Sequence, residues 1–156
     1  MSVFAIEIKG LKEMQLAFEK SPLEVGKILE RATIKAGEVV RTMAMREAPR
    51  GQTGKLRDYM KSDYKPIQVR IYPGVDYAIY VHEGTRAHFP PVSAVSRWAV
   101  SHGINPWALA VSMAKKGTKA NPFFERTIQE AKRSGRVQDV YDEALGEIIN
   151  LLATYE

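Results

Sequence analysis

Residues 21–47 read SPLEVGKILERATIKAGEVVRTMAMRE and form the longest helical pattern in the chain. Ser21 followed by Pro22 is typical of a helix start, and Pro49 ends the pattern because proline disfavours helical geometry in the residue before it. The apolar side chains make one broken stripe: Leu23, Ile28, Leu29, Ala32, Ala36, Val39, Val40 and Met43. A helix of about 26 residues spans about 40 Å. We therefore expect this helix to be the scaffold against which a sheet packs.

Two segments with strand character flank this helix. Residues 3–8 (VFAIEI) are rich in β-forming side chains, and a terminal strand of this kind is suited to an edge of a sheet. Residues 67–72 (IQVRIY) alternate cleanly between apolar and polar side chains. Their apolar face carries Ile67, Val69 and Ile71. This alternation predicts a half-buried antiparallel strand.

The remaining segments are predicted to be mostly helical. Helices are expected at residues 11–19, 92–102, 107–116, 123–133 and 136–155. Thr53 is placed to cap a turn over residues 54–59, and Asn105 and Asn121 each precede a proline at a helix start. Trp98 and Trp107 are expected in the core. We find no internal repeat.

Together these elements predict a single α+β domain over residues 1–156: a small, mostly antiparallel sheet on a long helix, several short helices and a C-terminal amphipathic helix. The chain length suits one domain. The last helix, at about 136–155, carries apolar residues at spacings of three and four. It can pack on its own domain or on a neighbouring protomer, and we favour its own domain.

The central stretch, Asp76-Tyr-Ala-Ile-Tyr-Val-His-Glu-Gly-Thr-Arg86, predicts a helix of two turns. Asp76 suits the N-cap and Gly84 suits the C-terminal stop, although the same side chains are compatible with a strand. One interpretation places the rings of Tyr77 and Tyr80 in the core, with Glu83 capping a nearby helix or turn. The other places the stretch at a protomer boundary, where it positions an exposed loop stiffened by prolines. The candidate interface residues are Tyr77, Tyr80, Glu83, Gly84, Thr85, Arg86 and Phe89.

Five signals occur in a fixed order along the chain. They are Thr53-Gly-Lys-Leu-Arg57, Pro73-Gly-Val-Asp-Tyr-Ala-Ile-Tyr-Val-His-Glu-Gly-Thr-Arg86, Pro90-Pro-Val-Ser-Ala94, Trp98-Ala99 and Asn121-Pro-Phe-Phe124. In this order they resemble the tail-completion and head-tail connector family of long-tailed bacteriophages and prophages, whose members are neck or minor tail components. The resemblance runs from about Leu23 to Ile128 and gives His82 no role.

The resemblance implies a structural virion protein. Its copies would assemble into a ring, with six as the expected number, between the head connector and the tail-tube or tail-terminator proteins. Packaged DNA would run through the lumen. The protein would be made in the host bacterial cytoplasm and end at the head-tail junction of the virion. The alternative from another class is a free-standing, non-specific DNA-binding module.

Charge is unevenly distributed along the sequence. All 23 Lys and Arg lie in residues 1–136 with 13 acidic residues, whereas residues 137–156 hold five acidic residues and no Lys or Arg. The region from Arg31 to Arg57 is the most basic, with seven Lys or Arg against two acidic residues. A basic body suggests either contact with nucleic acid or docking of unlike faces between copies. The candidate DNA-facing residues are Arg46, Arg50, Lys55 and Arg57.

No catalytic constellation is recognisable in the sequence. The chain has no cysteine, and His82 and His88 are six residues apart, a spacing that does not place two ligands on one helical face. No serine lies in a Gly-x-Ser-x-Gly elbow, and Gly51-Gln-Thr-Gly-Lys55 lacks the spacing of a phosphate-binding loop. His82 is expected on a helix surface. We expect a protein without enzymatic activity, cofactor or metal, and without a membrane-spanning segment.

Overall fold

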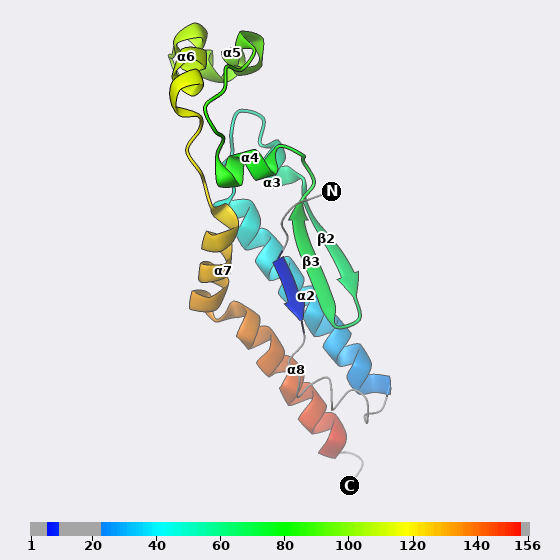
Figure 1. Ribbon diagram of the computed structural model, residues 1–156. Coiled ribbons are helices and arrows are strands. Elements are labelled where there is room, and N and C mark those ends of the chain that lie inside the picture. The colour runs from blue at the N-terminus through cyan, green and yellow to red at the C-terminus, as the bar shows by residue number, and fades with distance from the viewer. Residues whose placement is uncertain (1–5, 10–22, 154–156) are drawn as a thin grey trace.

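The computed structural model describes residues 6–9 and 23–153. The elements follow in the order β1 (Ile6–Lys9), α2 (Leu23–Glu47), α3 (Lys55–Asp58), β2 (Met60–Lys65), β3 (Gln68–Pro73), α4 (Ala78–Glu83), α5 (Val92–Ser101), α6 (Pro106–Lys116), α7 (Phe123–Ser134) and α8 (Arg136–Ala153). This arrangement confirms the predicted α+β class with a long helix in the N-terminal half (Figure 1). The expected helix at 11–19, the helix start at Ser21-Pro22 and residues 3–5 of the first strand lie outside the described residues.

The strands form an antiparallel sheet in the order β1-β3-β2. Ile6 of β1 lies opposite Ile71 of β3, and Met60 of β2 lies opposite Pro73, so β1 is at an edge as expected for a terminal strand. Val69 and Ile71 are fully buried, and both β2 and β3 contact α2. The predicted alternation is therefore confirmed for these two residues.

Helix α2 is the centre of the molecule. Its buried positions include most of the predicted stripe, from Ile28 and Leu29 to Met43, whereas Leu23 at the start of the helix is exposed. The sheet packs on one side of α2, and α7 and α8 run back along another side (Figure 1). The scaffold role expected for this helix is thus what the structure shows.

Helix α8 packs on α2 of the same chain. Val140 and Ala144 are buried against Ile28, Ala32 and Ala36. At the margin of this contact, Arg31 pairs with Glu147 at 2.9 Å and Lys35 pairs with Glu143. In this single chain α8 is therefore held against α2 by an apolar contact with charged pairs at its margin.

Helices α5 and α6 form a hairpin, residues Val92–Lys116, that projects from one end of the elongated molecule (Figure 1). The two helices pack mainly against each other, and the small residues Ala99 and Ala110 are fully buried between them. Asn105 caps α6 as predicted, because its side-chain oxygen accepts hydrogen bonds from the amides of Trp107 and Ala108.

Three predicted helix caps are wrong. Asp76 lies inside a turn closed by the amide of Ala78 on the carbonyl of Val75, so the N-cap of α4 is Tyr77. Gly54, in the left-handed conformation, takes the N-cap of α3 in place of Thr53. Pro122 takes the N-cap of α7 in place of Asn121. No helix within the described residues has the length and apolar character needed to cross a membrane.

Candidate assembly interface

An open cleft of about 1390 Å³ lies where the hairpin meets the rest of the protein. One wall comes from the loop 49–53 and from α4, and the opposite wall comes from Ala94 and Trp98 of α5 and Met113 of α6. The side-chain amide of Gln52 donates to the carbonyl oxygen of Arg97 at 3.2 Å and so ties the loop to the hairpin. The cleft is therefore built by segments that are distant in sequence.

Six of the seven candidate interface residues line this cleft. They are Tyr77, Tyr80, Glu83, Gly84, Thr85 and Arg86. The seventh, Phe89, lies on the hairpin side, where its ring meets that of Trp107 edge-on at a centroid distance of 5.4 Å. The structure thus brings most of the predicted set together and separates one member from it.

The two tyrosines of α4 are exposed. The side chain of Tyr77 is 43% exposed and that of Tyr80 is 61% exposed, so the interpretation that placed both rings in the core is wrong. Helix α4 has only six residues and buries only Ala78 fully, which leaves the larger side chains facing the cleft. Partial desolvation raises the pKa of Tyr77 above its usual value. Both rings are available for contact with another molecule.

Two chain segments form a neck between the hairpin and the rest of the protein. Thr85 and Thr118 exchange backbone hydrogen bonds at 3.2 Å in both directions, and their hydroxyl oxygens lie 3.0 Å apart. Gly84 and Gly117 precede them with φ of 77° and 70°, a region that side chains disfavour. A Cβ at Gly117 would lie 1.9 Å from the carbonyl oxygen of Thr85. The close approach of the two segments therefore requires glycine.

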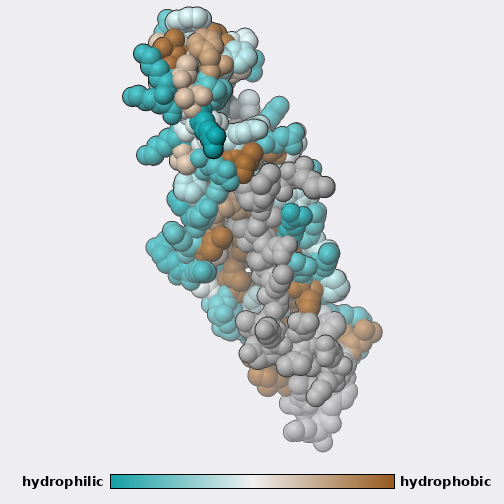
Figure 2. All heavy atoms as spheres, viewed as in Figure 1, coloured by the Kyte–Doolittle hydropathy of each residue, from teal (hydrophilic) through white to brown (hydrophobic). Residues whose placement is uncertain are grey.

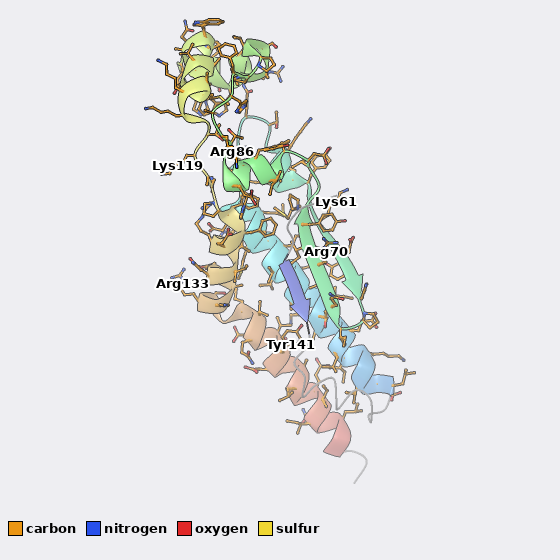
Figure 3. All side chains as sticks on the ribbon, in the orientation of Figure 1. Lys61, Arg70, Arg86, Lys119, Arg133 and Tyr141 are labelled. Atoms are coloured by element: carbon orange, nitrogen blue, oxygen red, sulfur yellow. The ribbon has the colours of Figure 1, made fainter. Side chains whose placement is uncertain are left out.

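The neck is a short repeat that was missed from the sequence. Gly84-Thr-Arg-Ala87 and Gly117-Thr-Lys-Ala120 are the same apart from one basic residue, and the structure pairs them in antiparallel fashion. Figure 3 shows Arg86 and Lys119 on the two segments at this point.

His82 was expected at the surface of a helix, but the structure places it in a mostly buried position. Its side chain is 11% exposed, its ring lies edge-on to that of Phe123 at 5.4 Å, and its Nε2 lies 2.6 Å from a carboxylate oxygen of Glu125. These contacts join α4 to the start of α7. Within residues 6–9 and 23–153, no three His, Asp or Glu side chains form a group that could hold a metal ion.

The tryptophans of the hairpin are also more exposed than predicted. Trp98 is 39% exposed and Trp107 is 61% exposed, so the expectation that both belong to the core is wrong. A two-helix hairpin has only one internal face, and that face is filled by small residues. Figure 2 shows apolar side chains at the surface of the hairpin.

The candidate DNA-facing residues lie around the C-terminal end of α2. Arg46, Arg50 and Lys55 are exposed. Arg57 has a structural role, because its Nε donates to the carbonyl oxygen of Ala48 at 2.6 Å and its Nη2 to that of Arg46 at 3.2 Å. These bonds satisfy carbonyl groups at the helix end. The exposed part of the predicted patch is therefore the first three residues.

The comparisons with known proteins agree with the resemblance found in the sequence. Residues 12–84, just under half of the chain, match the family model described as "Bacteriophage HK97-gp10, putative tail-component". Neither the curated proteins nor the solved structures gave a match. The matched segment includes α2, the sheet strands β2 and β3, and α4, and ends at Gly84 before the hairpin. Over residues 12–84 the chain is therefore similar to the HK97-gp10-like family of phage tail components.

Proposed function

We propose that this phage tail component joins heads to tails. Its copies form a ring between the head connector and the tail-tube or tail-terminator proteins, DNA passes through the ring, and the protein catalyses no reaction. The proposal is supported by the family match and, above all, by the cleft, in which exposed aromatic rings of α4 face a projecting hairpin. Exposed aromatic side chains beside a concave surface are typical of protein interfaces.

The cleft suits a protein segment as its occupant. Tyr77 and Tyr80 offer large apolar surfaces that lose little conformational entropy on binding, whereas Glu83 and Arg86 offer charges of both signs. Mixed charges at the rim of an aromatic surface favour one register of a partner over others. Loop 49–53 and the neck hold these walls in place through backbone and side-chain hydrogen bonds.

Substitution in the cleft tests the joining role. The double variant Tyr80→Ala/Arg86→Ala removes an exposed ring and an exposed charge from the cleft. The control Tyr59→Ala/Lys65→Ala removes a tyrosine and a basic residue from exposed positions outside it. Each variant is supplied to phage that lack the native gene. With Tyr80→Ala/Arg86→Ala, we expect filled heads and finished tails to remain unjoined in electron micrographs. The control variant should restore joining. Equal joining by both variants, at equal thermal stability, would contradict the role of the cleft.

Contact with DNA is assigned to Arg46, Arg50 and Lys55. Such contact is independent of base sequence and sensitive to salt. Replacing all three by Gln should lower the fraction of joined particles that retain DNA at low salt, and should make that fraction less sensitive to salt than in the native protein. The matched control replaces Lys132, Arg133 and Arg136, which are exposed on α7 and α8, by Gln. Unchanged DNA retention in the variant of Arg46, Arg50 and Lys55 would show that these residues do not contact DNA.

A further inference from the structure

The hairpin and its neck lack acidic residues. From Gly84 to Phe124 the chain has five Lys or Arg and no Asp or Glu. Arg97, Lys115 and Lys116 belong to the hairpin, and Arg86 and Lys119 belong to the neck. An unbroken positive charge of this kind repels basic surfaces and favours a partner that is acidic.

The far end of the hairpin is apolar and largely exposed. Val100 is 68% exposed, Ile104 is 39% exposed and Trp107 is 61% exposed, all close to the turn between α5 and α6. The basic residues lie nearer the neck. The hairpin therefore presents an apolar tip followed by a basic base, and a matching partner has an apolar area followed by an acidic one.

Helix α8 offers that pattern on the side that faces away from α2. At 100° per residue, Asp139, Asp142, Leu145 and Ile149 share the outward face, opposite the buried Val140 and Ala144. Leu145 is 45% exposed and Ile149 is 60% exposed. Glu143 and Glu147 lie on the flank and are engaged by Lys35 and Arg31, so the outward acidic pair is Asp139 and Asp142.

We propose that the hairpin of one copy docks on the outward face of α8 of the next copy. The apolar tip lies on Leu145 and Ile149, and the basic residues near the neck face Asp139 and Asp142. The hairpin and the last turns of α8 are at opposite ends of the molecule (Figure 1), so the contact joins unlike surfaces, and repeating it closes a ring if the rotation per copy allows. The inference rests on the proposed ring and names the surfaces that form it.

Engineered disulfides test the contact directly, because the chain has no cysteine of its own. The variant Trp107→Cys/Ile149→Cys should form covalent dimers and higher multimers on oxidation, and reduction should reverse them. The control Trp107→Cys/Tyr59→Cys moves the second thiol to an exposed site away from α8 and should stay monomeric. The inference is overturned if Trp107→Cys/Ile149→Cys gives no multimers at any concentration, or if both variants give equal amounts of multimer.

A charge exchange gives the second test. Lys115→Glu/Lys116→Glu and Asp139→Lys/Asp142→Lys should each lower the mass measured in solution to that of a monomer, and the four substitutions together should restore association. Rings that persist in both double variants would overturn this contact while leaving the proposed ring intact. A solution mass that is monomeric for the native chain at all concentrations would count against the contact and the free ring alike. If Lys115→Glu/Lys116→Glu instead keeps the native mass and loses only a salt-sensitive DNA mobility shift, the hairpin is a nucleic-acid surface and the inference fails.

Discussion

Gly37 of α2 lies directly against Val69 of β3. A Cβ at Gly37 would come within 2.8 Å of Cγ2 and 3.0 Å of Cγ1 of Val69, and within 3.2 Å of the Tyr64 ring. Val69 is fully buried and sits in the central strand, so it has little room to move. This contact sets how closely the long helix approaches the sheet.

Gly37→Ala should therefore destabilise the protein by about 1–2 kcal/mol, because overpacking outweighs the gain in helix propensity. Gly146→Ala is the matched control, since Gly146 lies within α8 and a Cβ there would meet nothing within 4 Å. The control should stabilise by up to about 1 kcal/mol. Urea unfolding measures both free energies, and stabilisation by Gly37→Ala would contradict the close approach of α2 to the sheet.

The neck permits a second paired comparison. Gly117 and Gly103 have φ of 70° and 67°, but only Gly117 lies against backbone, whereas a Cβ at Gly103 would meet nothing within 4 Å. Gly103→Ala should cost about 1–2 kcal/mol for the left-handed conformation alone. Gly117→Ala should also separate the neck, and hydrogen exchange at the amides of Thr85 and Thr118 should accelerate. Equal exchange at these amides in the two variants would contradict the role assigned to Gly117.

The link between α2 and β2 predicts a dependence on acid. The hydroxyl of Tyr64 donates to a carboxylate oxygen of Glu38, and this bond, together with Arg41, lowers the pKa of Glu38 below its usual 4.5. Stability from this carboxylate is therefore present above about pH 4.5 and is lost as the pH falls through the lowered value. Because the carboxylate is partly exposed, we expect less than about 1 kcal/mol.

Tyr64→Phe tests this dependence. The difference in unfolding free energy between the native chain and the variant should be larger at pH 7 than at pH 3. Tyr59→Phe, at an exposed position, should give the same difference at both pH values. A Tyr64→Phe effect that does not change with pH would show that the bond to the ionised carboxylate contributes nothing.

The elements that the sequence predicted well are those with a local cause. The long stripe of α2, the alternation of Val69 and Ile71 and the cap at Asn105 each depend on neighbouring residues in the chain. The caps at Asp76 and Asn121 failed because a turn or a proline shifted the helix start by one residue. Such shifts depend on how the chain enters the helix, which spacing alone does not reveal.

The orientation of aromatic side chains could not be predicted in the same way. The spacing of Tyr80 fits a buried stripe and Trp107 was expected in the core, but α4 is short and the two-helix hairpin leaves most of Trp107 exposed. The prediction for His82 was wrong in the opposite direction: the side chain is more buried than expected, because Phe123 packs against it from a distant part of the chain. Six of the seven candidate interface residues nevertheless line one cleft, because they belong to one continuous segment from α4 to the neck.

Arg126 fixes the platform from which the neck and hairpin extend. Its Nε donates to Oε2 of Glu47 at 2.9 Å, and its Nη2 donates to the carbonyl oxygen of Glu47 at 3.0 Å and to Oδ1 of Asn121 at 2.6 Å. The amide of Asn121 in turn donates to the carbonyl oxygen of Val81 at 3.0 Å. One guanidinium thus joins the end of α2 to the last residues of the neck.

Arg126→Met keeps the aliphatic stem and removes all three bonds, so it should cost about 1–3 kcal/mol in urea unfolding. Arg133→Met is the control, because Arg133 pairs with Glu130 one turn away on the same helix and its side chain is 80% exposed. That loss should stay below about 0.5 kcal/mol. In Arg126→Met, Oδ1 of Asn121 no longer accepts the hydrogen bond from Arg126. Hydrogen exchange at the amide of Thr118 should therefore also accelerate in this variant and not in the control. Equal losses of stability with unchanged exchange would mean that the neck is held by its own backbone bonds and not by the end of α2.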